Sequence, residues 1–326
     1  MGRCRSPMPG SDRVLARALI PLLLFGVLAS CASTPVNHEG ARAPRAAQIV
    51  PLKSERPLLA LALGSGGARG FAHVGVIKAL EAAGIVPDII AGASSGAVVA
   101  ALYASGYRAS ALADIALSIE QDTLVDFTLF GRGWVLGEAL QDFVNRTVGN
   151  RPIENLARPF AVIATRARDG TMTVFNRGDT GLAVRASSSV PNLFIPPVIN
   201  GEEYIDGGLT SPVPVSVTRA MGADIVIAVD VSWFAQARNS DTEIPPSRSA
   251  RRLLLERELD AADIVITPRT VRGRILDFDH KLANIAAGEE AAREVVPQLQ
   301  ELIARIAAQK RPPALSSTPA AAVSAE

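Results

Sequence analysis

The feature that most constrains the fold is a repeated succession of a continuous apolar run, a glycine-containing turn and a helical pattern. Residues 58–63 are apolar throughout and end at Gly64, and apolar side chains then recur at near-helical spacing over residues 71–83. A run that is apolar at every position is typical of a parallel strand covered on both faces, and residues 225–231, apolar except at Asp230, are interpreted in the same way. The sequence therefore predicts an α/β fold with a mainly parallel sheet between helices.

The same two patterns predict the other elements. Further strands are expected at residues 89–91, 160–165, 172–175 and 264–267. Further helices are expected at residues 97–105, 136–148, 182–189, 213–221 and 281–306. Since 48% of the 326 residues are apolar, the chain is able to bury a sizeable core in one or two domains.

The N-terminus has the pattern of a secretory signal peptide, with arginines before an apolar run at residues 18–29. The run is too short to span a bilayer. It ends in the sequence LASC, which resembles a bacterial lipobox, whose cysteine receives a diacylglyceryl group. We expect residues 1–30 to be removed and Cys31 to be lipidated; the alternative is an ordinary cleavage site with an incidental cysteine.

The remainder divides into three expected parts. Residues 31–56, rich in Ala, Pro, Arg and Asn, are expected to be a lipidated N-terminus and tether, and residues 311–326 a disordered tail, which leaves residues 57–310 as the domain. The expected location is the bacterial cell envelope, facing the periplasm and bound to a bilayer surface through Cys31. Ala32 is not the aspartate that retains some lipoproteins at the inner membrane, which favours the outer one.

Net charge and composition limit the partners. A formal net charge of +1 without a basic stripe provides no footprint for nucleic acid. No Cys or His pair has metal-ligand spacing and the calcium-loop pattern is missing, so no metal and no cofactor are expected. The sequence identifies no protein partner.

Ser94 is the candidate nucleophile. It is the centre of GASSG at residues 92–96, which fits G-x-S-x-G between an expected strand and an expected helix. Such a turn presents the serine hydroxyl at a helix N-terminus, whose dipole favours developing negative charge. The pattern alone occurs by chance in many proteins, so the strand and helix around it carry the prediction.

A glycine-rich loop, GSGGARG at residues 64–70, follows the first strand. Its spacing does not fit the dinucleotide fingerprint, and the Gly-Lys-Ser/Thr of a P-loop is absent. Successive backbone N–H groups exposed by glycines are able to stabilise an oxyanion. The alternative is a turn that only lets helix and strand pack closely.

Asp206 is the candidate base, placed by the sequence YIDGG on a tight turn at a strand end. An aspartate before glycine is common in ordinary turns. A Ser-Asp-His triad would need His280 with Asp206 or Asp230, because His38 lies in the expected tether and His73 is expected to pack or hydrogen bond in a helix.

Taken together, these segments resemble the patatin-like phospholipase family, in its bacterial branch. The family's segments appear in order: GSGGARGFAHVGVIKAL, DIIAGASSGAVVAALYASG, ASSSVPNLFIPPV, YIDGGLTSPVPV and MGADIVIAVDV. The likeness extends from about Leu58 to Ala292. It implies a three-layer α/β/α fold and a serine and aspartate dyad that needs no histidine.

The resemblance implies a role for each matching residue. Ser94 falls on the nucleophile and Asp206 on the base. Gly92 and Gly96 form the nucleophile elbow, Gly207 and Gly208 complete the DGG motif, and the oxyanion loop comprises Gly66, Gly67, Ala68, Arg69 and Gly70. Ser65 stands where many members have a further glycine, which puts the loop's detailed geometry in doubt.

The implied activity is hydrolysis of carboxylic esters of phospholipids or lysophospholipids through an acyl-serine, with membrane lipid as substrate. Two alternatives are a non-catalytic scaffold that binds lipid or protein and a serine acyltransferase or thioesterase. Residues 121–134, with Phe127, Leu129, Phe130 and Trp134, are interpreted either as a mobile apolar cap or as a packed core loop.

Overall fold

The computed structural model describes residues 1–2, 36–128, 133–238, 249–271 and 273–311. The chain divides into two units, Met1–Val36 and Asn37–Glu326, and the fold below is that of the second. The expected signal peptide, apart from residues 1–2, lies outside the described residues, as do Cys31 and residues 312–326. No helix within the described ranges is long and apolar enough to cross a membrane.

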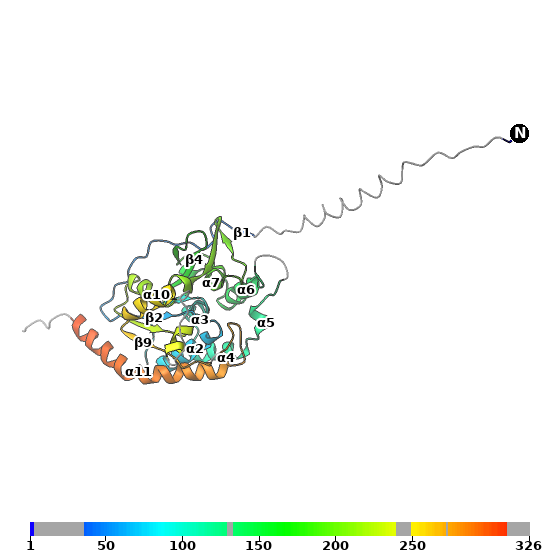
Figure 1. The fold of residues 1–326 in the computed structure, drawn as a ribbon. Coiled ribbons are helices and arrows are strands. Elements are labelled where there is room, and N and C mark those ends of the chain that lie inside the picture. Colours follow the sequence, from blue (N-terminus) through cyan, green and yellow to red (C-terminus); the bar gives the residue numbers. More distant parts are fainter. Residues whose placement is uncertain (3–35, 129–132, 239–248, 272, 312–326) are drawn as a thin grey trace, which may run out of the picture. The chain divides into compact units, whose positions relative to one another are not determined.

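The described strands form one nine-stranded sheet in the order β1-β6-β7-β4-β3-β2-β8-β9, with β5 paired to β4 (Figure 1). Their bounds are β1 Asn37–His38, β2 Leu59–Leu63, β3 Ile89–Ala93, β4 Phe160–Arg166, β5 Met172–Phe175, β6 Val198–Ile199, β7 Glu202–Asp206, β8 Ile225–Val229 and β9 Ile264–Ile266. Strands β4, β3, β2, β8 and β9, which are consecutive in the sheet, run parallel to one another. Strands β5 and β7 pair antiparallel with β4. The mainly parallel α/β sheet is confirmed.

Helices cover both faces of this sheet. Those of the described residues are η2 Gly67–Gly70, α2 Phe71–Ala82, α3 Ser95–Ala104, α4 Ala109–Ser118, α5 Gln121–Leu124, α6 Glu138–Thr147, η3 Ile153–Asn155, α7 Thr180–Ser188, η4 Gly207–Leu209, α8 Val215–Ala220, α9 Trp233–Arg238, α10 Ser249–Asp260 and α11 Lys281–Lys310. The expected helices lie within a few residues of observed ones, whereas α4, α5, α9 and α10 were not expected.

Strand β2 shows how one sequence run serves two cores. Successive side chains of a strand point to opposite faces, so Leu59, Leu61 and Leu63 join the cluster formed with α2, α3 and α11. Ala60 and Ala62 join the second cluster, formed with α8, α9 and α10. A strand buried on both faces needs apolar residues at every position, which explains the unbroken run.

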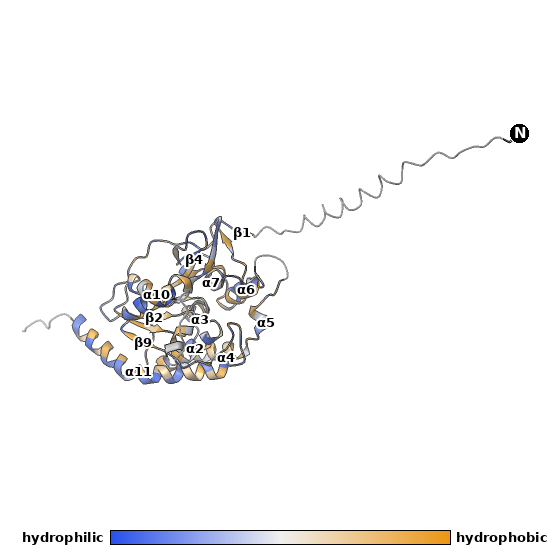
Figure 2. Cartoon of the chain, in the orientation of Figure 1, coloured by the Kyte–Doolittle hydropathy of each residue, from blue (hydrophilic) through white to orange (hydrophobic). Residues whose placement is uncertain are grey.

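Helix α11 packs tightly against α2. A Cβ on Gly75 would lie 1.8 Å from the carbonyl oxygen of Ile285, and one on Gly288 would lie 1.9 Å from that of Ala72. The two backbones therefore approach each other through paired glycines. Figure 2 shows α11 with both hydrophobic and hydrophilic residues along its length, as expected for a helix that covers a core with one side.

The segment expected to be a tether lies on the domain from Asn37 onward. Strand β1 pairs with β6, and the side-chain amide of Asn176 donates to the Ala47 carbonyl while accepting from the Ala47 N–H. The Leu52 N–H donates to the Met221 carbonyl over 2.9 Å. These are mostly backbone contacts, which require no apolar period, so composition did not reveal them.

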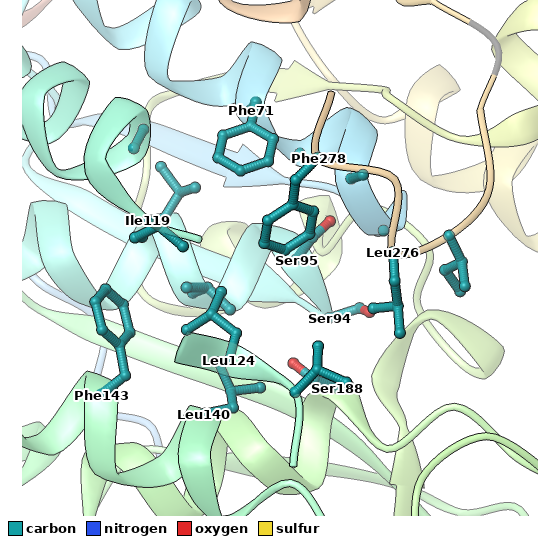
Figure 3. Close-up of a pocket in the computed structure, with 18 of the residues that line it drawn as sticks. Phe71, Ser94, Ser95, Ile119, Leu124, Leu140, Phe143, Ser188, Leu276 and Phe278 are labelled. Carbon is teal, nitrogen blue, oxygen red and sulfur yellow. The ribbon is translucent and has the colours of Figure 1, made fainter. Parts of the chain in front are cut away.

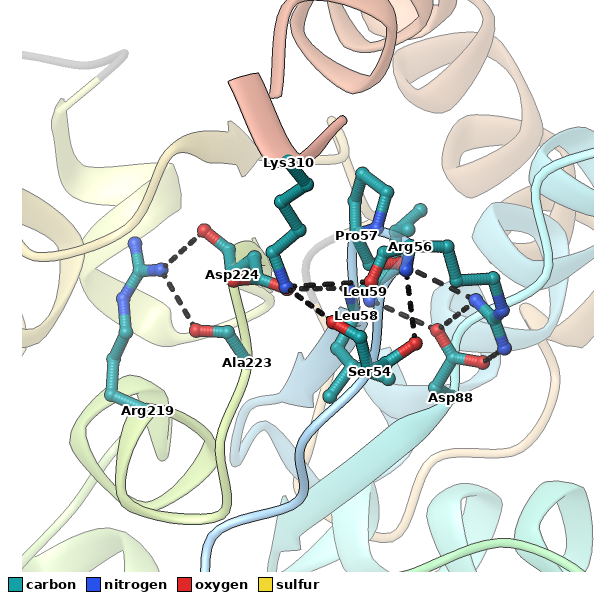
Figure 4. A network of polar contacts seen from close by, with 10 residues as sticks. All are labelled: Ser54, Arg56, Pro57, Leu58, Leu59, Asp88, Arg219, Ala223, Asp224 and Lys310. Carbon is teal, nitrogen blue, oxygen red and sulfur yellow. Dashed lines mark hydrogen bonds and ion pairs between the residues drawn. The ribbon is translucent and has the colours of Figure 1, made fainter. Parts of the chain in front are cut away.

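Both ends of the domain meet at one polar network (Figure 4). The Lys310 ammonium, at the end of α11, donates to the carbonyl oxygens of Ser54 and Arg56 and to the carboxylate of Asp224. Arg56 in turn pairs with Asp88. Helix α11 ends at Lys310.

Candidate active site

Ser94 lies on a strained turn between β3 and α3. Its φ of 54° and ψ of −126° are unusual for a residue with a Cβ. Its N–H donates to the buried Ser187 hydroxyl over 2.8 Å, which holds the turn in place. A Cβ on Gly92 or Gly96 would come within 2.6 Å or 2.2 Å of backbone atoms, so both glycines of the elbow are required for this close approach.

Asp206 ends β7 and caps η4. Its Oδ1 accepts from the Gly208 N–H over 2.8 Å, and its backbone carbonyl accepts from the Thr165 hydroxyl over 2.9 Å. A Cβ on Gly207 would lie 1.9 Å from the Ile163 carbonyl oxygen. The DGG turn thus fits against β4 only because its second residue has no side chain.

Ser94 and Asp206 are both buried and border the same cavity, where the Ser94 hydroxyl is near enough to the Asp206 carboxyl to act on its pKa. Burial raises the pKa of Asp206 above the ordinary aspartate value, while the Ser94 hydroxyl, the Arg251 charge and the Gly208 N–H lower it by smaller amounts. The structure therefore brings together the two residues predicted as nucleophile and base. A raised pKa strengthens a carboxylate as a base toward a hydroxyl.

The glycine loop lies beside Ser94 and is fixed from several sides. The Gly66 N–H donates to the Ser95 hydroxyl over 3.1 Å, and the Ala68 N–H donates to the Ile275 carbonyl over 2.8 Å. Gly67 has a φ of +60° and begins η2, so its N–H has no acceptor within that helix. Because Gly67 borders both cavities that meet at Ser94, its amide is the best-placed candidate oxyanion donor.

Arg69 and Gly70 complete the predicted loop in structural roles. The Arg69 Nε donates to the Val231 carbonyl over 2.8 Å and ties the loop to the end of β8. Burial lowers the pKa of Arg69, and the nearby Arg251 charge lowers it further against the opposing effect of Asp230. A Cβ on Gly70 would lie 2.7 Å from the Ser95 side chain, so this glycine admits the start of α3.

An apolar cavity of about 140 Å³ leads away from Ser94 between α2, α3, α4 and α6. Figure 3 places Ser94 toward one end and Phe143 at the other, with Ile119, Leu124 and Leu140 between. Among its lining residues only three serines have polar side chains, and Ser95 and Ser188 lie near Ser94. Its shape and lining suit an acyl chain whose carbonyl carbon lies at Ser94.

A second cavity, of about 370 Å³, also opens at Ser94, and its lining includes charged side chains, which that of the first does not; this is the polar cavity. Asp206, Arg69 and Arg251 contribute to its lining. Arg251 was missed by sequence reasoning because it belongs to an unexpected helix, α10, and to no motif. Its Nη2 donates to the Ser65 hydroxyl over 3.0 Å, so the residue that departs from the family pattern has a defined partner.

Neither histidine of the domain body borders Ser94. His280 precedes α11, is 43% exposed and lies 3.9 Å from Asp277, and it is not among the residues that line either cavity at Ser94. His73 is buried with Nε2 2.8 Å from the Gly64 carbonyl oxygen, and burial lowers its pKa to about 4. The expected hydrogen-bonding role of His73 is confirmed. The described residues contain no group of three potential metal ligands.

The segment interpreted as a cap is partly described. Phe127 and Trp134 are 68% and 62% exposed, while Leu129 and Phe130 lie outside the described residues. Val125 and Val135 pack with Phe194 in a small cluster next to the apolar cavity. The ends of the segment are thus packed, and its two described aromatic side chains face solvent.

Comparison with known proteins identifies the relatives of this chain. A sequence model described as patatin-like phospholipase matches residues 61–219. An uncharacterised NTE family protein of Mycobacterium tuberculosis is 38% identical over 193 residues, which cover 58% of this chain and 53% of that protein. Another from the same species is 31% identical over 301 residues, covering 82% and 51%.

A mammalian protein and a solved structure are also similar to this chain. The mouse patatin-like phospholipase domain-containing protein 6 is 34% identical over 182 residues, which are 53% of this chain and 13% of that protein. The crystal structure of VipD from Legionella pneumophila superposes with a TM-score of 0.49 and 13% identity, covering 83% of this chain and 73% of that one. The chain spans about half the length of the mycobacterial relatives.

Proposed function

Because the family match and the patatin-like α/β fold support placing this chain in the patatin-like phospholipase family, we propose that it is a serine hydrolase of lipid esters. Its substrates would be the carboxylic esters of phospholipids or lysophospholipids. The observation that carries the proposal is the position of Ser94 beside the buried carboxyl of Asp206, where an apolar and a polar cavity meet.

Acylation would proceed by attack of the Ser94 oxygen on the ester carbonyl carbon. Asp206 accepts the hydroxyl proton, and the carbonyl oxygen, now negative, accepts a hydrogen bond from the Gly67 N–H. The intermediate collapses, the bond to the alcohol breaks, and the departing alcohol takes the proton from Asp206. One oxyanion donor contributes about 3 to 4 kcal/mol to transition-state stabilisation in serine hydrolases.

Deacylation repeats the sequence with water. Asp206 accepts a proton from the water that attacks the acyl-serine, the oxyanion forms again, and Ser94 recovers its proton as the fatty acid leaves. The acyl chain remains in the apolar cavity during both steps. Since no histidine borders the described cavities at Ser94, the single carboxylate serves as both base and acid.

The first experiment compares four versions of the chain on p-nitrophenyl esters of short and long acyl chains. Ser94→Ala and Asp206→Asn are expected to lower kcat/KM by at least about a thousandfold, because each removes a member of the dyad. His280→Ala is expected to retain wild-type activity. Activity lost in His280→Ala and kept in Asp206→Asn would replace the dyad with a histidine triad; a folded but inert wild type would favour a scaffold.

We further propose that the protein is an envelope lipoprotein held at a bilayer by Cys31, a residue outside the described part. The support is the apolar run at residues 18–29 and the LASC sequence that follows it. Several acyl chains on one residue bind a bilayer firmly, since each buried methylene contributes about 0.8 kcal/mol. Growth with labelled palmitate should label the wild type and not Cys31→Ala; label that survives this substitution would refute the anchor.

A further inference from the structure

Two arginines bring positive charge to the polar cavity beside Ser94. Arg69 and Arg251 both line it, and none of the ion pairs among the described residues includes either of them. Both side chains are partly buried, and the Arg251 charge acts on Arg69 strongly enough to lower its pKa in addition to the effect of burial. The charges of Asp206 and Asp230 act on Arg251 and Arg69 respectively, and the cavity still brings two guanidinium groups together beside Ser94.

The donors of Arg251 are incompletely used. Its Nη2 donates to the Ser65 hydroxyl, while its buried Nε has no hydrogen-bond partner within the described structure. A guanidinium presents five N–H donors in a planar fork that matches phosphate or carboxylate oxygens. Arg69, by contrast, is tied by its Nε to the Val231 carbonyl. Arg251 is therefore the group best suited to meet an anion entering the cavity.

The arrangement of the two cavities determines which part of a substrate would reach Arg251. Ser94 and Gly67 border both of them, so a carbonyl placed at Ser94 with its acyl chain in the apolar cavity directs its alcohol into the polar one. In a glycerolipid only the short glycerol unit separates the ester from the phosphate. The phosphate would thus enter the cavity that contains the two guanidinium groups.

We propose that Arg251, on α10, binds the phosphate of the departing alcohol and makes the enzyme selective for phosphate-bearing lipid esters over neutral ones. The proposal rests on the ester hydrolase function proposed above. Helix α10 follows the region matched by the family model, which ends at residue 219, so this selectivity would come from a part of the chain outside that match.

The test uses two esters with the same acyl chain, 1-palmitoyl-lysophosphatidylglycerol and 1-palmitoylglycerol, in micelles of one neutral detergent. The ratio of their kcat/KM values is expected to fall at least about tenfold in Arg251→Gln, mainly through KM for the phosphate-bearing ester, because a charged hydrogen bond is lost. Arg252→Gln, the same charge change on the next residue, is the control. Arg252 is exposed and pairs with Glu256, so the ratio should stay at the wild-type value.

A second control separates phosphate binding from support of the loop. Ser65→Gly removes the contact between Arg251 and the loop while keeping the charge, and should alter both esters alike. If Ser65→Gly reproduces the effect of Arg251→Gln on the ratio, or if Arg251→Gln leaves the ratio unchanged, the phosphate role is wrong. Arg251→Lys, which keeps a phosphate-binding cation, should recover part of the ratio.

If the wild type hydrolyses neither ester, that result counts against the proposed hydrolase function. The role of Arg251 in phosphate binding is then tested by a binding measurement. Calorimetry with the non-hydrolysable ether analogues of the two lipids should show tighter binding of the phosphate-bearing one to Ser94→Ala. Adding Arg251→Gln should remove that difference. Equal binding of both analogues to Ser94→Ala would overturn the proposal.

Discussion

Ser94 and Asp206 show how far single residues were predictable from their local sequence. The elbow glycines and the DGG turn limit the backbone so strongly that the positions of both functional groups follow from a few consecutive residues. Arg251 has no such local signature. It lies beside Arg252 in an arginine-rich helix, and only tertiary packing directs one side chain to the polar cavity and the other to solvent.

At the same scale, the buried carboxyl of Asp206 should lower the free energy of unfolding at neutral pH. Burial raises the pKa of Asp206, against smaller opposing effects from Ser94, Arg251 and the Gly208 N–H. A carboxyl with a raised folded-state pKa favours the fold while protonated, below the unfolded value of about 3.9, and that contribution is lost as pH rises through the folded-state pKa. Between these two pKa values the loss is about 1.4 kcal/mol per pH unit.

Asp206→Asn removes this titration, since an amide stays neutral while its oxygen can accept from the Gly208 N–H. We expect its Tm to exceed that of the wild type at pH 7 and the two to converge near pH 3.5. Thermal unfolding followed by circular dichroism from pH 3.5 to 8 checks this. Ser94→Ala keeps the carboxyl and removes a group that lowers its pKa, so its stability should depend on pH at least as strongly as that of the wild type. An Asp206→Asn protein less stable than the wild type at pH 7 would contradict the raised pKa.

At the scale of elements, the central strands were predictable because burial on both faces demands unbroken apolar runs such as β2 and β8. Helix α10 was not expected, because its apolar positions are few and its charged residues many; only Leu255 and Leu259 are buried. The short strands β1 and β6 are two residues each. Strand β1 pairs with the distant β6, which no local pattern records, whereas β6 also forms a hairpin with β7 across the turn at Asn200 and Gly201.

Helices α4 and α6 set the far wall of the apolar cavity. Ile115, Ile119 and Phe143 line this cavity and also a separate surface hollow bordered by Tyr107 and Arg146. These three side chains therefore lie between the apolar cavity and the surface hollow. Figure 3 shows Ile119 and Phe143 on the side of the cavity remote from Ser94. The length of acyl chain that fits should depend on them.

Phe143→Ala is expected to open this wall and shift the preference of the enzyme toward longer acyl chains. Each additional methylene that becomes buried adds up to about 0.8 kcal/mol, or about fourfold in kcat/KM. The measurement is kcat/KM across p-nitrophenyl esters of increasing length. Phe71→Ala, which removes a ring that stacks edge-on against Phe278 and does not border the hollow, should leave the length preference in place. An identical shift in both variants would show that added volume alone matters.

At the scale of the whole molecule, the folded domain extends beyond the segments that contain its sequence motifs. Residues 37–56 contain no recognisable element apart from β1, yet they supply the carbonyl acceptors of Ser54 and Arg56 for Lys310 at the end of α11. Through these contacts the beginning and the end of the domain stabilise one another. The boundary expected at residue 57 separates groups that the structure joins.

This predicts different stabilities for two shortened chains. A chain that begins at Asn37 should unfold at the temperature of the mature protein, whereas one that begins at Pro57 loses the pairing of β1, the contacts of Ala47 and Leu52 and two acceptors of Lys310. At about 1 kcal/mol net for each hydrogen bond the loss is several kcal/mol, and a domain of this size then loses roughly 10 °C in Tm.

Lys310→Met in the chain that begins at Asn37 separates the two contributions. It removes the charge that joins the ends and leaves β1 and the contacts of Ala47 and Leu52 in place, so its Tm should fall between those of the two shortened chains. Because Asp224 also loses its partner and partly buried carboxylates tolerate this poorly, the decrease should be measurable by calorimetry. Equal melting temperatures for the chains that begin at Asn37 and Pro57 would instead mean that residues 37–56 behave as a tether. The domain would then begin at its first apolar run, residues 58–63.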